Sequence, residues 1–157
     1  LGFQPDGVYV ATGDHMLKVA FQNTAGVAPV TSQGASENGQ TQPLGQVSYA
    51  SLWEGISLTY EGAGGGIAKS SYLLEPGAEV DQIRLRYNVP VQVDEGGGLS
   101  FEFASGQMRE TAPVAWQDIN GQRIPVEVAF HIVTPPLSLI GAGGEGLVGF
   151  TLGKYDP

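Results

Sequence analysis

Residues 115–132 read AWQDINGQRIPVEVAFHI, and this stretch shows how the chain is organised. Asn120-Gly121 is the strongest hairpin signal in the sequence, because a two-residue type I′ turn needs positive φ at both central positions. Beyond the turn, apolar residues occupy every second position, at Val126, Val128, Phe130 and Ile132. A period of two places such side chains on one face of a strand. The stretch therefore predicts a β-hairpin that joins residues 115–119 to residues 124–132.

The same alternation recurs along most of the chain. Apolar side chains alternate with polar or small ones in residues 17–21, 56–60, 83–87, 99–103 and 148–152. Turn signals rich in Gly, Pro, Asn and Asp separate these runs, and residues 94–98 are one of them. Only residues 49–53 have the character of a short helical turn. About ten short strands predict an all-β fold with negligible helix, an antiparallel β-sandwich or an open barrel-like pair of sheets.

The phase of the alternation predicts which side chains are buried. Side chains of one parity should face the core, and in the clearest runs these are Leu85, Phe101, Phe103, Val128 and Phe130. Their neighbours of the other parity should face solvent, namely Arg84, Arg86, Glu102 and Glu127.

Length and composition predict a single domain, residues 1–157. Residues 23–43 are rich in Thr, Ser, Gln, Asn and Gly and have few apolar side chains, which predicts a long polar surface loop.

Charge and residue content exclude several functions. The chain has 16 acidic against 7 basic residues and a net charge of -9, which excludes an electrostatic nucleic-acid binder. No apolar run approaches the roughly 20 residues of a membrane span. The chain has no Cys, so disulfides, thiolate nucleophiles and thiolate metal sites are excluded as well.

Two glycine-rich segments have the letters of nucleotide-binding loops but not their context. Residues 141–146 match G-x-G-x-x-G, but a strand-like run follows where the dinucleotide site needs a helix. Residues 62–70 end in Lys69-Ser70 like a phosphate loop, but Ala63 and Ala68 occupy both required glycine positions. We interpret both segments as hairpin connectors, and we predict no cofactor.

Catalytic and metal-binding candidates are few. His15 and His131 are far apart in the sequence, His15 in a turn and His131 on the polar face of its strand. No G-x-S-x-G elbow is present. Turn carboxylates can coordinate calcium, although solvated turn acids are the favoured interpretation here. These carboxylates are Glu75, Glu79, Asp81, Asp94 and Glu95. We predict no catalytic, cofactor-binding or metal-binding residue and no enzymatic activity.

The two tryptophans allow two interpretations. Trp and Tyr bury large areas while keeping a polar edge, so we expect Trp53 to fill the core and Trp116 to pack beneath the Asn120-Gly121 hairpin. The alternative is a sugar-stacking platform built from Trp53, Trp116 and some of the six Tyr.

Several segments in one order resemble an uncharacterised all-β domain of large secreted bacterial proteins, often found ahead of SBBP-type β-propeller repeats. The clearest is Leu52-Trp53-Glu54-Gly55-Ile56-Ser57-Leu58-Thr59-Tyr60, which looks like an L-[WY]-x-G-[IV]-x-L-x-Y pattern. The resemblance runs from about Leu44 to the end, and the first forty residues match loosely. It implies a family-like core of residues 44–157, preceded by a hairpin lead-in and long polar loop in residues 1–43. Its other segments are residues 72–79, 83–87, 91–95, 112–121 and 148–157.

The resemblance implies an extracellular or cell-surface β-module without known catalytic residues. It also implies that a further apolar strand follows the final Tyr-Asp-Pro, so that one sheet of this chain has an open edge for a neighbour. We expect a non-catalytic module for assembly or surface attachment, with protein partners through homotypic or strand-edge contacts. The alternative is a carbohydrate-binding module that accompanies a secreted hydrolase.

Overall fold

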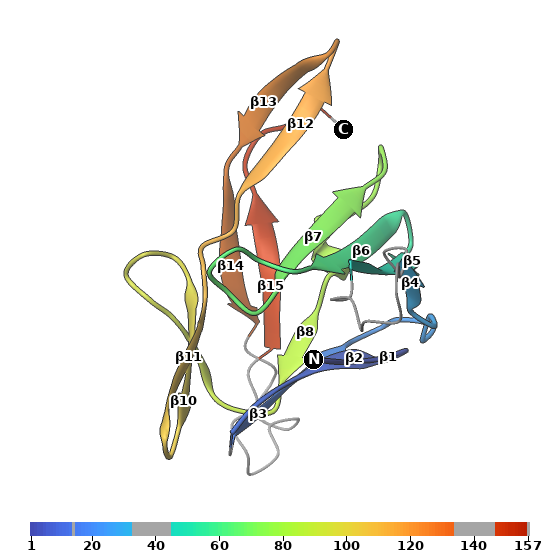
Figure 1. The fold of residues 1–157 in the computed structure, drawn as a ribbon. Helices are drawn as coiled ribbons and strands as arrows, with labels where there is room; N and C mark the ends of the chain where they lie inside the picture. Colours follow the sequence, from blue (N-terminus) through green and yellow to red (C-terminus); the bar gives the residue numbers. More distant parts are fainter. Residues whose placement is uncertain (14, 33–44, 134–146, 157) are drawn as a thin grey trace.

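The computed structural model describes residues 1–13, 15–32, 45–133 and 147–156, and these residues are almost entirely β-structure (Figure 1). Within them, fifteen strands form four antiparallel sheets, and the 3-10 turn η1 (Val80–Gln82) is the one helical element. The all-β prediction is confirmed. The strands are more numerous than predicted. The predicted run 124–132 divides between two sheets, and residues 2–4, 30–32, 46–53 and 106–110 form strands that were not predicted.

The largest sheet brings strands from the beginning and the end of the chain together. Its strand order is β1-β2-β3-β8-β15-β14. The bounds are β1 (Gly2–Gln4), β2 (Gly7–Thr12), β3 (His15–Phe21), β8 (Leu85–Tyr87), β15 (Leu147–Leu152) and β14 (Val128–Val133). Alternate side chains face inward, and most of the inward set is buried. The buried members are Val8, Leu17, Val19, Phe21, Leu85, Tyr87, Phe130, Val148 and Phe150.

A four-stranded sheet of order β4-β5-β6-β7 forms the second layer. Its strands are β4 (Val30–Ser32), β5 (Gln46–Trp53), β6 (Ile56–Glu61) and β7 (Lys69–Leu74). The possible helical turn at residues 49–53 is wrong, because this segment continues β5. The register between β5 and β6 shifts between Tyr49 and Trp53, and Ser51 has a φ of 47°. Because of this irregularity, apolar and polar residues do not alternate strictly in this part of β5.

Aromatic side chains join the two layers into a sandwich. Ring centroids lie 5.5 Å apart for Phe3 and Tyr60, 5.2 Å for Phe21 and Tyr49, and 5.2 Å for Tyr72 and Phe150. Each pair takes one ring from each sheet, in the tilted or edge-on geometries that aromatic pairs prefer.

Trp53 occupies the same interface. Its ring is 3% exposed, and Nε1 donates a hydrogen bond of 2.9 Å to the carbonyl oxygen of Gln22. The prediction that Trp53 fills the core is confirmed.

Two smaller sheets complete the described part of the chain. The first contains β9 (Val91–Val93), β10 (Leu99–Phe103) and β11 (Gly106–Glu110), in the order β11-β10-β9. Phe101 of β10 packs on Tyr87 of the six-stranded sheet, with 4.8 Å between ring centroids. The second is a separate ribbon of β12 (Ala115–Ile119) and β13 (Gln122–Val126).

The predicted turn at residues 94–98 joins β9 to β10 as expected. Asp94 Oδ1 accepts hydrogen bonds of 2.9 Å and 3.0 Å from the backbone N–H groups of Gly96 and Gly98. An Asp at the start of such a turn stabilises it locally, which explains why the sequence predicted it.

Most predicted burial is confirmed, with three corrections. Leu85, Phe101 and Phe130 are buried, while Arg86, Glu102 and Glu127 are exposed. Phe103 and Val128 are only half-buried, since both lie near the end of a strand at the margin of the core. Arg84 was predicted to be exposed, but its side chain is 22% exposed because it lies against the backbone of β15.

The predicted polar loop of residues 23–43 is partly wrong. Residues 30–32 form β4, the exposed outer strand of the four-stranded sheet, paired with β5. Residues 33–43 lie outside the described residues.

Candidate functional site

The β12–β13 ribbon extends beyond the other sheets (Figure 1). Asn120 and Gly121 form its turn with φ of 51° and 77°, as the type I′ prediction required. The strand after the turn was predicted to continue to residue 132. It ends instead at Val126, and β14 begins at Val128 in the six-stranded sheet. In the described residues, β12 and β13 therefore pair only with each other.

One face of the ribbon presents Trp116 to solvent. Trp116 is opposite Pro125 and Asp118 is opposite Arg123, which places these four side chains on the same face. The Trp116 side chain is 44% exposed, and the Arg123 guanidinium lies 4.5 Å from its ring centroid. Arg123 Nε also lies 3.6 Å from Asp118 Oδ1. The Arg123 guanidinium therefore covers part of one face of the indole ring in a cation–π contact.

The prediction that Trp116 packs beneath the hairpin is therefore wrong. It assumed that β12 and β13 belong to a core sheet, whereas they form a separate one. Val114, just before β12, is 80% exposed, and Ile124 of β13 is also exposed. Exposed apolar side chains gathered on one projecting element are typical of an interaction surface.

The opposite face of the ribbon holds the last described residues. Gln117 Nε2 donates to the Asp156 carbonyl oxygen, and Gln117 Oε1 accepts from the Asp156 N–H, both at 3.0 Å. These two hydrogen bonds hold Asp156 against β12. Tyr155, beside it, is exposed.

A second feature, absent from the sequence predictions, is an internal cluster of three tyrosines and Glu110. Tyr60 and Tyr72 come from the four-stranded sheet, Tyr87 comes from the six-stranded sheet, and Glu110 ends β11. The Tyr87 hydroxyl donates a 3.3 Å hydrogen bond to Glu110 Oε2. Three sheets meet at this cluster. The alternating runs 56–60 and 83–87 include Tyr60 and Tyr87, but the sequence gave no sign that these two residues meet Tyr72 and Glu110.

Burial raises the pKa of every titratable group in this tyrosine cluster. It raises the pKa of Glu110 above the ordinary value, and the hydrogen bond from Tyr87 partly offsets that increase. Burial, with the nearby Glu110 carboxylate, also raises the pKa of Tyr60 and Tyr87. Burial is also the main cause that raises the pKa of Tyr72, and electrostatic interaction with the nearby Tyr60 raises it further. The cluster therefore favours the neutral form of each group and contributes to packing.

His15 and Ser105 meet across 90 residues of sequence. Ser105 Oγ lies 3.2 Å from His15 Nδ1, and the imidazole stacks on Phe103 with 4.7 Å between ring centroids. His15 was predicted to lie in a turn, but it begins β3. A serine beside a histidine has the composition of a nucleophile and its base. No acid that orients the imidazole contacts His15 in the described residues, so this pair alone does not make a catalytic triad.

The other predicted candidates do not converge. His131 is exposed on β14, as predicted. Lys69 begins β7, a strand rather than a helix, and forms a 2.9 Å ion pair with Glu61. Residues 141–146 lie outside the described residues. No group of three or more His, Asp and Glu with metal-binding geometry occurs in the part of the chain that the structure describes.

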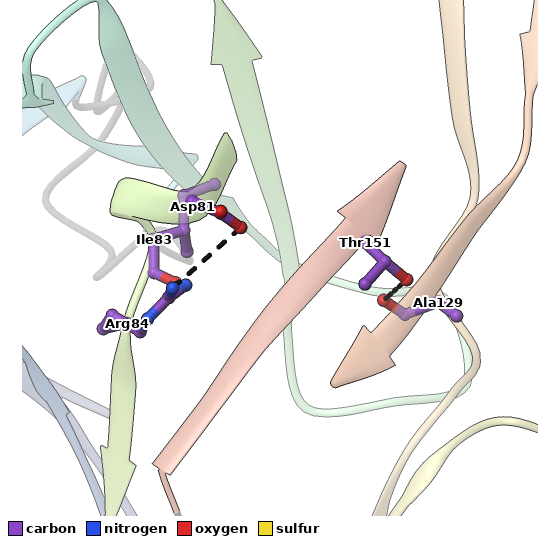
Figure 2. Close-up of polar contacts among 5 residues, drawn as sticks. All are labelled: Asp81, Ile83, Arg84, Ala129 and Thr151. Carbon is purple, nitrogen blue, oxygen red and sulfur yellow. Dashed lines mark hydrogen bonds and ion pairs between the residues drawn. The ribbon is translucent and has the colours of Figure 1, made fainter. Parts of the chain in front are cut away.

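A shallow depression of about 250 Å³ lies at the end of β14 and β15. Figure 2 shows one of its polar contacts, in which Thr151 Oγ1 donates a 3.5 Å hydrogen bond to the Ala129 carbonyl oxygen. Glu127 supplies its one carboxylate. The volume is below that of ordinary ligand pockets. It is lined by Glu127, Val128, Ala129, Thr151, Leu152 and Gly153.

Comparison with known proteins identifies the family but not an activity. Residues 14–157 match the family described as Domain of unknown function (DUF7948), and the chain belongs to it. The match begins well before Leu44, so it includes β3, which the sequence resemblance covered only loosely. No curated protein and no solved structure matches the chain. None of the helical structure in the described residues is long and apolar enough to cross a membrane.

Proposed function

We propose that the chain is a non-catalytic module of an extracellular bacterial system and that it binds neighbouring copies through the β12–β13 ribbon. The secreted setting, ahead of β-propeller repeats, rests on the sequence resemblance. The contact itself rests on the exposed ribbon, which is the single observation that carries the proposal.

The ribbon has what a strand-edge contact needs. Each of its strands lacks a second neighbour among the described residues, so backbone N–H and C=O groups on the outer edges face away from the pair. Trp116 supplies a large exposed ring beside them, and tryptophan is among the side chains that dominate binding energy at interfaces. A neighbouring strand gains backbone hydrogen bonds from the edge and apolar contact from Trp116.

Carbohydrate binding is the alternative, and the exposed Trp116 is the observation in its favour. A flat sugar platform uses two or more coplanar rings. In the described residues the exposed aromatic side chains are Trp116 and Tyr155. Tyr155 lies next to Asp156, which is bound from the ribbon face opposite Trp116. This arrangement favours a protein contact over a sugar platform.

Sedimentation equilibrium of the isolated chain at high salt tests the proposal, since high salt screens charge contacts and leaves apolar ones. We expect the average mass to rise with concentration for the natural sequence. Trp116→Ala should keep the chain monomeric. Leu73→Ala, which removes a side chain 70% exposed on β7, is the matched control and should associate normally.

A chain that stays monomeric at every concentration contradicts the assembly proposal. Soluble oligosaccharides are then titrated into that monomer. If they quench its tryptophan fluorescence, and Trp116→Ala abolishes the quenching, carbohydrate binding replaces the assembly proposal.

A further inference from the structure

The turn of the β12–β13 ribbon contains a chemically reactive pair of residues, Asn120 and Gly121. The side-chain carboxamide carbon of an asparagine can be attacked by the backbone nitrogen of the next residue, because the attack closes a five-membered ring. The side chain of that next residue usually shields the nitrogen, but glycine has no side chain. An asparagine that precedes a glycine is therefore the most favourable sequence for this ring closure.

The surroundings of the turn leave both reacting groups free. Asn120 and Gly121 are exposed, and a Cβ built on Gly121 would meet no atom within 4 Å. Within the described residues, neither the Asn120 carboxamide nor the Gly121 N–H forms a hydrogen bond. Water reaches both groups, and no partner has to be displaced before they react.

Asn88 has the opposite environment. Its Oδ1 accepts a 2.7 Å hydrogen bond from the Lys18 N–H, and its Nδ2 donates a 3.0 Å hydrogen bond to the Met16 carbonyl oxygen. The branched residue Val89 follows it. Asn88 is therefore an internal reference for an asparagine whose side chain is held in place.

The closed turn slows the reaction, and local opening permits it. Ile119 pairs with Gln122 across the turn, which restrains the backbone rotation that brings the carboxamide to the Gly121 nitrogen. In the described part of the chain, β12 and β13 pair only with each other, and none of residues 115–126 belongs to the hydrophobic core. Elements with few buried contacts open locally without global unfolding. The turn can therefore open while the sandwich stays folded.

We propose that Asn120-Gly121 is a site of spontaneous modification, at which an isoaspartyl link forms and undoes the β12–β13 ribbon while the sandwich stays folded. In the first step the Gly121 nitrogen bonds to Cγ of Asn120, and the bond from Cγ to Nδ2 breaks. The departing amine takes the Gly121 amide proton and leaves as ammonia. The product is a succinimide ring, and the step needs no oxidant or reductant.

Water then opens the ring at one of its two carbonyl carbons. If the bond between the Gly121 nitrogen and Cγ breaks, the ordinary backbone returns and residue 120 is an aspartate. If the bond to the backbone carbonyl carbon breaks, the main chain runs through Cβ and Cγ and carries a free α-carboxylate. This isoaspartyl link is one atom longer than the ordinary backbone.

The longer link is incompatible with the turn. A two-residue type I′ turn fixes the register of its hairpin through its length and backbone geometry. An additional backbone atom disrupts the pairing of Ile119 with Gln122, and the ribbon has no core contacts that would restore it. The exposed surface around Trp116 then loses its shape. The inference does not depend on what the ribbon binds, because it concerns the turn itself (Figure 1).

Incubation of the folded chain at mildly alkaline pH tests the proposal. Trypsin cleaves after Arg109 and Arg123, so Asn120 is the one asparagine in the peptide 110–123. Mass spectrometry of this peptide measures the conversion of amide to acid, and electron-transfer fragmentation distinguishes isoaspartate from aspartate. Amide hydrogen exchange of the same samples shows which strands remain paired.

Two variants separate the chemistry from its consequence. Asn120→Gly keeps a type I′ turn, since Gly-Gly is one of its favoured pairs, and removes the carboxamide. Freshly prepared Asn120→Asp carries the new charge without the additional backbone atom, and Asp-Gly also suits this turn.

We expect Asn120 to be converted progressively in the natural chain, with isoaspartate among the products, while Asn88 remains intact. The isoaspartyl chains should lose the exchange protection of β12 and β13 and keep that of the core strands. Aged Asn120→Gly and fresh Asn120→Asp should keep the protection of both.

Three results overturn the proposal. The first is an Asn120 that stays intact in the folded chain under conditions that convert it in the urea-unfolded chain, because the turn would then prevent the reaction. The second is an isoaspartyl chain whose ribbon keeps its exchange protection. The third is an aged Asn120→Gly chain that loses the ribbon as fast as the natural chain, because the loss would then have another cause.

Discussion

Two phenylalanines of β10, two residues apart, have different surroundings. Phe101 is 1% exposed and packs on Tyr87, whereas Phe103 is half-buried and stacks on His15. We expect Phe101→Ala to lower the free energy of unfolding by about 3–5 kcal/mol, because it leaves a cavity in the core. Phe103→Ala should lower it by about 1–2 kcal/mol, since less apolar surface is lost from a partly open site.

Urea unfolding of both variants beside the natural chain gives the comparison. Equal losses in the two variants would show that the margin of the core is not at Phe103. The sequence predicted both residues as core, because alternation identifies a face but not how far the opposing layer covers it.

Glu110 makes stability depend on pH. Its pKa is raised in the folded chain, so between the ordinary value near 4.5 and the raised value the folded state binds more protons than the unfolded state. The free energy of unfolding must then fall as pH rises through that interval. Glu110→Gln keeps an acceptor for the Tyr87 hydroxyl and removes the titration. We expect this variant to lose most of the fall and to be more stable than the natural chain at neutral pH.

Urea unfolding midpoints between about pH 4 and pH 8 measure this effect, a range that begins near the ordinary pKa of a glutamate carboxyl and extends above it. Glu95→Gln is the control, since Glu95 is an exposed turn residue. A natural chain and a Glu110→Gln variant with parallel pH profiles would show that the carboxylate is well solvated.

At the scale of single elements, the β12–β13 hairpin depends on its turn. Gly121 has φ of 77°, and a Cβ there would meet no atom within 4 Å, so backbone strain is the one cost of a side chain. That strain is about 1–2 kcal/mol for an ordinary residue. Gly121→Ala should therefore speed amide hydrogen exchange in β12 and β13 about tenfold and leave the core amides unchanged.

Gly64→Ala is the matched control, because Gly64 also has open space around it and has no positive φ. Faster exchange throughout the sandwich in Gly121→Ala would show that the ribbon unfolds together with the core rather than by itself.

Local chemistry explains which elements the sequence predicted. Asn120-Gly121 and the Asp94 turn are specified by residues within the turn itself, so both were found. The exposure of Trp116 was missed, because it depends on which sheet β12 joins, and that pairing is not local. The tyrosine cluster was missed for the same reason: its members come from β6, β7, β8 and β11, and no sequence pattern relates these strands.

At the scale of the whole molecule, buried phenols link the sheets to one another. Tyr49, Tyr60 and Tyr72 lie in the four-stranded sheet and Tyr87 in the six-stranded one, while Glu110 belongs to the three-stranded sheet. The Tyr49 hydroxyl also donates a 3.0 Å hydrogen bond to the Gln4 carbonyl oxygen of β1. Ionising any of these phenols places a negative charge between layers, so alkaline pH acts on the contacts that hold the sheets together.

These phenols predict a single alkaline unfolding transition. Burial raises the pKa of Tyr49 to about 12 and raises those of Tyr60, Tyr72 and Tyr87 above the ordinary value of 10.0. Above pH 10, the unfolded chain releases phenolic protons that the folded chain retains, so stability falls as pH rises. Tyrosinate absorbance and far-ultraviolet circular dichroism, followed together, should change at the same pH. Tyr60→Phe should move the transition to higher pH, and Tyr155→Phe, at an exposed position, should leave it in place. Full tyrosine ionisation with the strand signal intact would show that solvent already reaches the phenols in the folded chain.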